Sequence, residues 1–238
     1  MTPLRATTAQ IQRLATFSSC EVADALVKLK HPTGGYVPDL ERYSGSGDKP
    51  LVGEAFTVEM VDGRDKEAPK LDGHFVDLAE PGSIVFVSTP PNVKSASLGG
   101  LLATSLKVKG VKGFVTSGRC RDLAELRALD FPIFARGHSI LGQSPFTRVS
   151  AVQVPLRISS SSADPPASSS SLSPFPATDV HPYDLILADL DGVVVVRPEV
   201  IEEVMDLAEK GREVDERCMA DLLEGRGVKE TFAEHRGK

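Results

Sequence analysis

The pair Gly99-Gly100 stands twenty residues before the pair Arg121-Asp122, and this spacing constrains the fold more than any other feature of the chain. The glycines open an apparent helix, and free backbone N–H groups at a helix start favour an anion. The second pair follows a short β-prone run at 113–117 and precedes a helical pattern. If a helix, a turn and a strand connect the two pairs, both lie at one end of the fold. The spacing therefore indicates a site for an anionic substrate and a metal ion.

The segment between the two pairs fits this arrangement. Residues 101–108 repeat apolar side chains at helical spacing, and the strand at 113–117 is expected to end at Gly118. A second helix is expected over 122–129, so the Arg-Asp pair lies at a strand-to-helix corner. The predicted apolar stripe of the first helix consists of Leu101, Leu102, Ser105, Leu106 and Val108.

Simpler interpretations of the same residues remain open on spacing alone. Asp122 and Glu125 match the N-cap and N3 positions of a capping box, which would make both carboxylates structural. Arg121 fits a surface residue, and Gly99-Gly100 fits a flexible turn before a helix. Each signal taken separately is weak.

Composition sets broad limits on the class of protein. The chain has 238 residues, 41% of them hydrophobic, which is enough for one sizeable core, so we expect residues 1–238 to form a single domain. The formal net charge of -6 argues against general binding to nucleic acid or to an anionic membrane. The N-terminal stretch lacks an apolar leader, and no run approaches the roughly 18 apolar residues of a membrane helix. A cytoplasmic protein is expected.

Cysteine usage agrees with a reducing compartment. Cys20, Cys120 and Cys218 are scattered, without a Cys-x-x-Cys pair, which suggests neither a disulfide framework nor a structural zinc site. Cys120 adjoins the Arg-Asp pair, and a small buried residue is favoured over a nucleophile. Nucleotide binding has no support, because neither a P-loop nor a G-x-G-x-x-G motif after a strand occurs.

The rest of the chain mixes short strands with helices. Residues 159–178 are rich in Ser and Pro without apolar periodicity, so we expect a disordered surface insertion there. Apolar runs around Asp191-Gly192 predict a hairpin, which explains Asp189 and Asp191 as turn residues, with metal ligation as the alternative. The other expected elements are helices within 11–29, a loop over 31–50, strands over 52–61 and 83–88, and a helix from Glu199 that bends at Gly211.

Without a strict βαβ repeat, this order of elements favours an α+β fold with layers, β/β/α, over a doubly wound sheet. The patterns together resemble the family that contains the RraA-like proteins and the 4-hydroxy-4-methyl-2-oxoglutarate aldolases, most closely its fungal-looking members. The central Gly-x20-Arg-Asp-x2-Glu pattern is the specific part of the resemblance. Segments 19–26, 51–58 and 191–196 resemble the family as fold-building pieces. The resemblance implies a swivelling β/β/α sandwich assembled into homotrimers or dimers of trimers, with active sites between subunits.

The chemistry implied by the resemblance is that of a class II pyruvate aldolase, in which a divalent metal ion, Mg²⁺ or Mn²⁺, stabilises the pyruvate enolate. Arg121 would hold the carboxylate and keto oxygen of the pyruvoyl group, and Asp122 would ligate the metal. Oxygen ligands suit these ions, and the planar guanidinium fork matches a carboxylate. Backbone amides from Gly99, Gly100, Leu101 and Leu102 would bind the substrate carboxylate.

One position departs from the family pattern. Many relatives carry Asp or Glu where this chain has Gly100, and that carboxylate holds metal-bound water in the family; Gly100 has no side chain to do so. The family also takes a second acidic residue from a neighbouring subunit, near the C-terminal helix. The candidates for that residue in this chain are Glu213, Asp215 and Glu216.

The expected reaction is cleavage of 4-hydroxy-4-methyl-2-oxoglutarate, or a related 4-hydroxy-2-oxo acid, to pyruvate and a second 2-oxo acid. Decarboxylation of oxaloacetate would share the enolate. The alternative is a regulatory protein-binding module, because some relatives inhibit an RNA-degrading endonuclease. Gly100 slightly favours that alternative, whereas the set Arg121, Asp122 and Glu125 favours catalysis. A lyase of a specialised pathway, acting on an unusual acid, is a third possibility.

Overall fold

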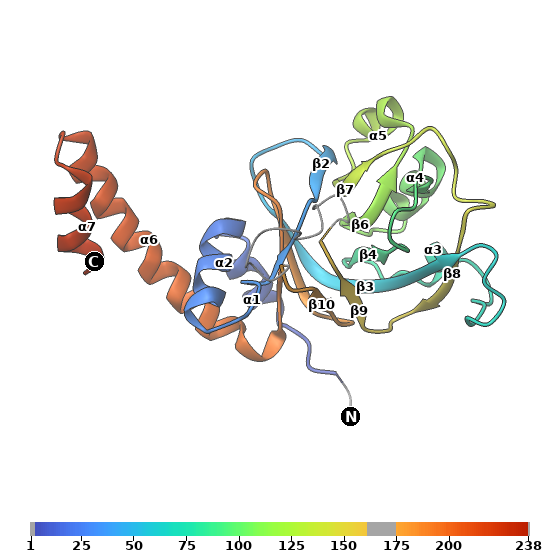
Figure 1. The fold of residues 1–238 in the computed structure, drawn as a ribbon, viewed down its shortest axis with the longest axis horizontal. Coiled ribbons are helices and arrows are strands. Elements are labelled where there is room, and N and C mark those ends of the chain that lie inside the picture. Colours follow the sequence, from blue (N-terminus) through green and yellow to red (C-terminus); the bar gives the residue numbers. More distant parts are fainter. Residues whose placement is uncertain (1–2, 161–174, 238) are drawn as a thin grey trace, which may run out of the picture.

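A curled sheet of ten strands forms the centre of the molecule in the computed structural model, which describes residues 3–160 and 175–237 (Figure 1). The strand order is β1-β12-β11-β3-β4-β6-β7-β2, with β5 beside β6 and β8 beside β3, and β9 and β10 form a separate pair. The strands are β1 (Tyr36–Val37), β2 (Glu41–Ser44), β3 (Leu51–Asp62), β4 (Ile84–Ser88), β5 (Ala96–Leu98), β6 (Gly113–Cys120), β7 (Ile133–His138), β8 (Thr147–Val152), β9 (Leu156–Ile158), β10 (Thr178–Val180), β11 (Leu185–Ala188) and β12 (Val193–Val196).

Three helices cover the central strands. The two N-terminal helices and the first part of the long helix α6 pack beside β11 and β12, and α7 lies away from the sheet at the far end of α6 (Figure 1). None of the helices in the described residues is both long and apolar enough to cross a membrane. The helices are α1 (Thr8–Leu14), α2 (Ser19–Lys28), α3 (Phe75–Leu78), α4 (Gly100–Val108), α5 (Leu123–Leu129), the 3-10 turn η1 (Pro198–Val200), α6 (Ile201–Leu223) and α7 (Val228–Arg236).

The four central strands β3, β4, β6 and β7 are parallel. Parallel neighbours need crossover connections, and here the crossovers contain α3, α4 and α5. These three helices bury Phe75, Leu106 and Leu126 against the same face of the sheet. The carboxyl ends of parallel strands meet at one edge, and β6 ends there at Cys120. That edge therefore presents the Arg121-Asp122 corner beside the start of α4.

Two further cores complete the layers. One packs α1, α2 and α6 onto β11 and β12, with Leu26, Leu187 and Met205 at its centre. The other fills the remaining face of the curled sheet, where β9 and β10 contribute Ile158 and Val180. The chain is thus a layered α+β fold, as the order of the elements predicted.

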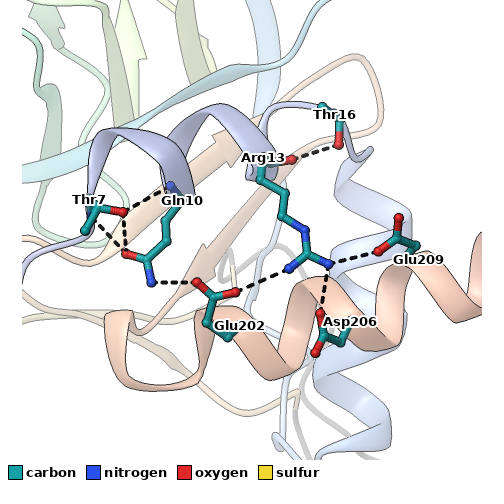
Figure 2. Close-up of polar contacts among 7 residues, drawn as sticks. All are labelled: Thr7, Gln10, Arg13, Thr16, Glu202, Asp206 and Glu209. Atoms are coloured by element: carbon teal, nitrogen blue, oxygen red, sulfur yellow. Dashed lines mark hydrogen bonds and ion pairs between the residues drawn. The ribbon is translucent and has the colours of Figure 1, made fainter.

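Charged side chains tie α1 to α6, as Figure 2 shows. Arg13 donates to Glu202 at 3.3 Å, to Asp206 at 2.8 Å and to Glu209 at 2.9 Å. Gln10 closes a capping box with Thr7 and also donates to Glu202 at 2.8 Å. Beyond these contacts α6 continues away from the sheet, and α7 folds back beside its far end (Figure 1).

Several local predictions are confirmed and others need correction. The hairpin at Asp191-Gly192 forms as β11 and β12, and the strands near 52–61 and 83–88 are β3 and β4. The predicted loop over 31–50 contains β1 and β2, because these short strands pair with distant partners, β12 and β7. The expected helix from Glu199 is a 3-10 turn followed by α6, and α7 was not foreseen.

Gly118 does not end β6, contrary to the prediction. The strand continues to Cys120, with a register shift against β7 between Thr116 and Arg119. A Cβ at Gly118 would lie 2.6 Å from the Thr89 side chain, so the glycine serves a close approach between neighbouring segments instead of a turn.

The Ser-rich insertion predicted over 159–178 overlaps a strand at its C-terminal end. Thr178 begins β10 and pairs with Ile158 of β9. The last residue of the predicted insertion therefore belongs to the β9–β10 pair. Residues 161–174, which hold most of the predicted insertion, lie outside the described residues. The expectation of disorder there stays a prediction.

The predicted apolar stripe of α4 is wrong at Leu101, Ser105 and Val108, which are exposed. Leu101 is 87% exposed and Val108 84% exposed, while Ala103 and Leu106 are fully buried. The helix turns its Gly100-Ala103-Leu106 side to the sheet, because small residues let its first turn approach α5 closely. Leu101 is left at the surface beside the Arg121-Asp122 corner.

Candidate active site

Asp122 ends up turned away from its own helix. It occupies the N-cap position of α5 in the left-handed region, with φ 63° and ψ 43°, and its side chain makes no capping hydrogen bond there. The carboxylate Oδ2 instead accepts from the backbone N–H of Gly100 at 3.0 Å, at the start of α4. The capping-box interpretation of Asp122 is therefore wrong. The carboxylate joins the two halves of the motif across the twenty intervening residues.

The two glycines make this approach possible. A Cβ on Gly99 would lie 2.5 Å from Oδ2 of Asp122 and 3.0 Å from Nε of Arg121. Gly99 has an extended backbone, with φ -138°, so close approach explains the glycine and φ does not. The Gly99-Gly100 pair is thus a surface against which charged groups pack, and the flexible-turn interpretation fails.

Glu125 belongs to the set of residues that favoured catalysis, but no role at the site was predicted for it. A Cβ on Gly100 would lie only 2.0 Å from Oε2 of Glu125, so this carboxylate fills the space that a side chain at position 100 would take. Glu125 lies one helical turn after Asp122 on α5, which puts both carboxylates on one side of the helix start. The alternative interpretation of Glu125, as the N3 partner in a capping box with Asp122, fails because Asp122 makes no capping hydrogen bond.

Arg121 completes the corner from the end of β6. Its backbone N–H donates to Leu98 O at 3.0 Å, which anchors the corner to β5. Its Nε lies 3.5 Å from Oδ2 of Asp122, and its side chain remains 42% exposed. A Cβ on Gly142 would lie 3.0 Å from Nη1, so the loop after β7 passes close beside the guanidinium. The guanidinium is held in place and keeps donors for a ligand.

The start of α4 supplies further donors. Gly100 N–H is used by Asp122, whereas the N–H groups of Leu101 and Leu102 have no hydrogen-bond acceptor among the described residues. Unpaired N–H groups in the first turn of a helix carry partial positive charge and suit an anion. The six residues predicted to bind substrate or metal therefore lie at one corner, and their binding roles stay predictions.

Cys120 takes no part as a nucleophile. It is fully buried beneath the corner, and burial raises the pKa of its thiol to about 11. The thiolate that nucleophilic catalysis needs is therefore scarce near neutral pH. The prediction of a small buried residue is confirmed.

The acids Asp189 and Asp191 also have a structural role. Asp189 accepts from the backbone N–H and the hydroxyl of Ser19, both at 2.7 Å, and from the backbone N–H of Asp191 at 3.0 Å. It thereby joins the hairpin turn to the start of α2. The turn interpretation accounts for these acids without a metal.

The three acids predicted to come from a neighbouring subunit lie on α6, on the portion that extends away from the sheet (Figure 1). Asp215 pairs with Arg236 of α7 at 2.5 Å. Within one chain, the described contacts of Glu213, Asp215 and Glu216 do not include the Arg121-Asp122 corner. Their role at an active site stays a prediction that requires a second copy.

A second acidic cluster lies at the α6–α7 turn. Ligand atoms of Asp221, Glu234 and His235 fall within 4.8 Å of one another. Arg226 already pairs with Asp221 at 2.5 Å and with Glu234 at 2.7 Å, which neutralises the acids. The ion pairs of this cluster therefore hold α7 against the end of α6.

Known proteins resemble this chain over most of its length. Residues 19–195 match the model of the RraA-like family, described as Aldolase/RraA. A protein of Halalkalibacterium halodurans named "Putative 4-hydroxy-4-methyl-2-oxoglutarate aldolase" is 28% identical over 214 residues, which cover 89% of each chain. An uncharacterized protein of Methanocaldococcus jannaschii is 29% identical over 211 residues, or 87% of each chain.

Solved structures share the fold. An uncharacterized protein from Pseudomonas syringae pv. tomato superposes with a TM-score of 0.79 at 22% identity, covering 98% of this chain and 97% of that one. Streptomyces coelicolor RraAS2, described as an unusual member of the RNase ES inhibitor RraA protein family, gives a TM-score of 0.70 at 23% identity over 90% and 96% of the two chains. With a family model that spans most of its length, the chain belongs to the RraA-like family.

Proposed function

We propose that this protein is a divalent-metal-dependent carbon–carbon lyase that cleaves 4-hydroxy-4-methyl-2-oxoglutarate, or a related 4-hydroxy-2-oxo acid, to pyruvate. Oxaloacetate decarboxylation is a second reaction of the same site, because both reactions leave an enolate of pyruvate. The relative named as an aldolase supports the proposal from sequence.

The observation that carries the proposal is the hydrogen bond from Gly100 N–H to Asp122. It draws a carboxylate away from capping α5 and into a corner that already contains Arg121 and the free N–H groups of α4. An Asp used for folding alone would cap its own helix, which contributes about 1 kcal/mol. The left-handed backbone at Asp122 and the lost cap are costs that a binding site explains.

The corner fits a hard divalent cation. Asp122 and Glu125 both bring carboxylate oxygens to the Gly99-Gly100 backbone, and the bound Oδ2 of Asp122 leaves Oδ1 without a hydrogen-bond donor among the described residues. Carboxylate oxygens are the ligands that Mg²⁺ and Mn²⁺ prefer. Such an ion, when bound by Asp122 and Glu125, supplies Lewis-acid stabilisation of developing enolate charge.

The chain's own groups bind and orient the 2-oxo acid. The Arg121 guanidinium offers a planar pair of donors to the substrate carboxylate, and the N–H groups of Leu101 and Leu102 complete an anion pocket. Gly142 keeps the loop after β7 close to the guanidinium, which limits its rotation. These donors would hold the carboxylate end of the substrate beside Asp122 and Glu125.

An assay of pyruvate release tests the proposal. The full chain is given 4-hydroxy-4-methyl-2-oxoglutarate or oxaloacetate with Mg²⁺ or Mn²⁺, and then with a chelator. Free metal ions also decarboxylate oxaloacetate, so every rate is taken relative to Asp122→Ala at the same metal concentration. We expect metal-dependent release that this variant abolishes. Equal rates for the wild type and the variant with both acids would refute the lyase.

The neighbouring-subunit acid is part of the same proposal. We place it among Glu213, Asp215 and Glu216, on the α6 segment that extends beyond the body of its own chain (Figure 1). A mixture of two inactive variants, Asp122→Ala and a triple variant of these acids, would regain activity if sites form between chains. Failure to regain activity would assign the complete site to a single chain.

A regulatory protein-binding module is the second candidate function. Leu101 is 87% exposed and Ile140 93% exposed, on segments that adjoin Gly100 and Arg121. Exposed apolar side chains at a rim are typical of an interface with another protein or with a second copy. A regulator would keep partner binding after Asp122→Ala, whereas the lyase loses its activity.

A further inference from the structure

A basic pocket opens on the face of the sheet opposite α4 and α5. Its volume is about 540 Å³, within the range of small-molecule sites. Strand alternation places it, because Ser88 and Arg136 point to the same face as Phe86 and Phe134, which belong to the core behind β9 and β10. Ile158 lines the pocket from that core. The pocket is therefore separated from the Asp122 corner by the sheet itself.

Basic side chains outnumber acidic ones among the described residues that line the pocket. Lys94, Arg119, Arg136 and Arg157 contribute positive charge, and the acid among the described lining residues is Asp39. Arg157 pairs with Asp179 at 3.1 Å. Among the described residues, none forms an ion pair with Arg119 or Arg136, although Asp39 interacts with the charge of Arg136.

The two unpaired arginines keep most of their donors. Among described residues, Arg119 donates once, to His138 O at 3.0 Å, and Arg136 donates once, to Ser159 O. A guanidinium has five N–H donors, and Nε of Arg136 is buried without a partner. Burial lowers the pKa of Arg136, an effect that Asp39 opposes. A half-buried cation with an unpaired donor is costly to bury, and a bound anion would lower that cost.

Hydroxyl and backbone groups surround the arginines. Ser88, Thr89, Ser117 and Ser159 line the pocket at the carboxyl ends of β4 and β6 and after β9. Ligands of open α/β sheets bind outside the carboxyl ends of parallel strands. Guanidinium forks and hydroxyls together match the oxygens of phosphate or carboxylate groups.

We propose that this pocket is a second, non-catalytic site that binds a small oxyanion, through Arg119 and Arg136 with Lys94 at the rim. Its ligand class is a molecule that carries a phosphate or several carboxylates. The pocket serves this purpose whether or not the Asp122 corner is a lyase, so the two proposals fail independently.

Calorimetric titration of the full chain in metal-free buffer tests the site, with inorganic phosphate in one arm and citrate in the other at constant ionic strength. We expect saturable binding that weakens at least about tenfold in Arg119→Gln and Arg136→Gln, or about 1.4 kcal/mol. Lys94→Gln, an exposed change that leaves the fold intact, should weaken binding by a smaller factor. Binding in one arm alone identifies the oxyanion as phosphate or as carboxylate.

Two control variants establish whether binding depends on this pocket. Arg64→Gln removes an arginine that is exposed and outside the pocket, and it should leave binding unchanged. Asp122→Ala should also bind normally. The proposal is overturned by absence of saturable binding in both arms, by equal weakening in Arg64→Gln, or by binding that Asp122→Ala changes while Arg119→Gln and Lys94→Gln do not.

Discussion

Two arginine–carboxylate clusters in this molecule, one at Arg13 and one at Arg121, contain the same residue types but have different roles. Arg13 reaches three acids on α6, all of them more than half exposed, and every charge has a partner (Figure 2). Arg121 lies 3.5 Å from one acid, Asp122, and keeps N–H donors that are not used within the cluster. The shortest hydrogen bond of the Asp122 carboxylate comes from the backbone N–H of Gly100. The first cluster is satisfied within the chain and holds helices together. The second is left incomplete, which is what a ligand site requires.

The two clusters also differ in the free-energy cost of their backbone conformations. Arg13 lies in an ordinary helix, whose capping box with Thr7 is complete. Asp122 adopts a left-handed conformation and leaves α5 without a side-chain cap. Natural chains retain such local costs where function demands a geometry. Mutations of matching residues in the two clusters should therefore separate activity from stability.

The largest effect is expected for Asp122→Asn. Asn tolerates the left-handed backbone and still accepts from Gly100 N–H, so the fold should persist while the negative charge is lost. We expect kcat for pyruvate release to fall about 10³-fold, with little change in Tm. Asp206→Asn, the matched change in the Arg13 cluster, should keep full activity. Comparable losses of activity in both variants would erase the distinction between the clusters.

Arg121→Lys comes next. Lysine keeps the charge but loses the planar fork, so we expect kcat/KM to fall about 10²-fold. Arg13→Lys is the control, because a point charge between three exposed acids still satisfies them. Steady-state kinetics of both variants provide the measurement. An Arg121→Lys enzyme with unchanged kcat/KM would show that Arg121 does not bind the substrate carboxylate through two parallel hydrogen bonds.

Gly100→Ala tests the packing of Glu125. The new Cβ would start 2.0 Å from Oε2 of Glu125, so this flexible carboxylate must move away. We expect metal affinity, measured by calorimetry, to fall about tenfold or more while the fold survives. Gly227→Ala is the matched control, since its Cβ meets nothing within 4 Å and its φ is -69°. Unchanged metal affinity in Gly100→Ala would exclude Glu125 from the site.

A smaller effect, on stability alone, is expected for Glu21→Gln. Burial raises the pKa of Glu21, but hydrogen bonds from Arg212 and Ser18 outweigh it, so the pKa is lowered overall from 4.5. A lowered folded-state pKa stabilises the protein above the unfolded value, and this stabilisation disappears as pH falls through the folded value. Tm at pH 7 should decrease by a few degrees in the variant. The difference from wild type should shrink below about pH 4, and a constant difference would contradict this pair.

The smallest effect is expected for Arg13→Gln. Exposed ion pairs contribute little and are screened by salt, so Tm should fall by less than about 3 °C at low salt and by less again at 0.5 M salt, where the Debye length is only several ångströms. Pyruvate release should not change. A collapse of the fold in this variant would show that the α1–α6 contacts of Figure 2 carry more of the stability than exposed pairs do.

Much of the framework around the site follows from local patterns. The helix at 100–108, the strand before Arg121 and the helix after Asp122 were predicted because glycine, β-prone residues and apolar spacing act within a few residues. The same local signals misled at Asp122 and Glu125, where a capping box was equally consistent with the spacing. Local rules rank conformations of one helix end and take no account of a competing donor 22 residues away.

The layered α+β class, the main strands and helices of the central sheet, and the corner on which Arg121 and Asp122 lie could be predicted from the residues alone. The folded molecule was needed to establish that β3, β4, β6 and β7 pair in parallel, that β1 and β2 form inside a predicted loop, and that Leu101 faces outward. It was also needed to find the partner of Asp122 and the place of Glu125. The cause is distance along the chain, because strand pairing, close glycine contacts and carboxylate partners depend on segments that meet only once the sheet has formed.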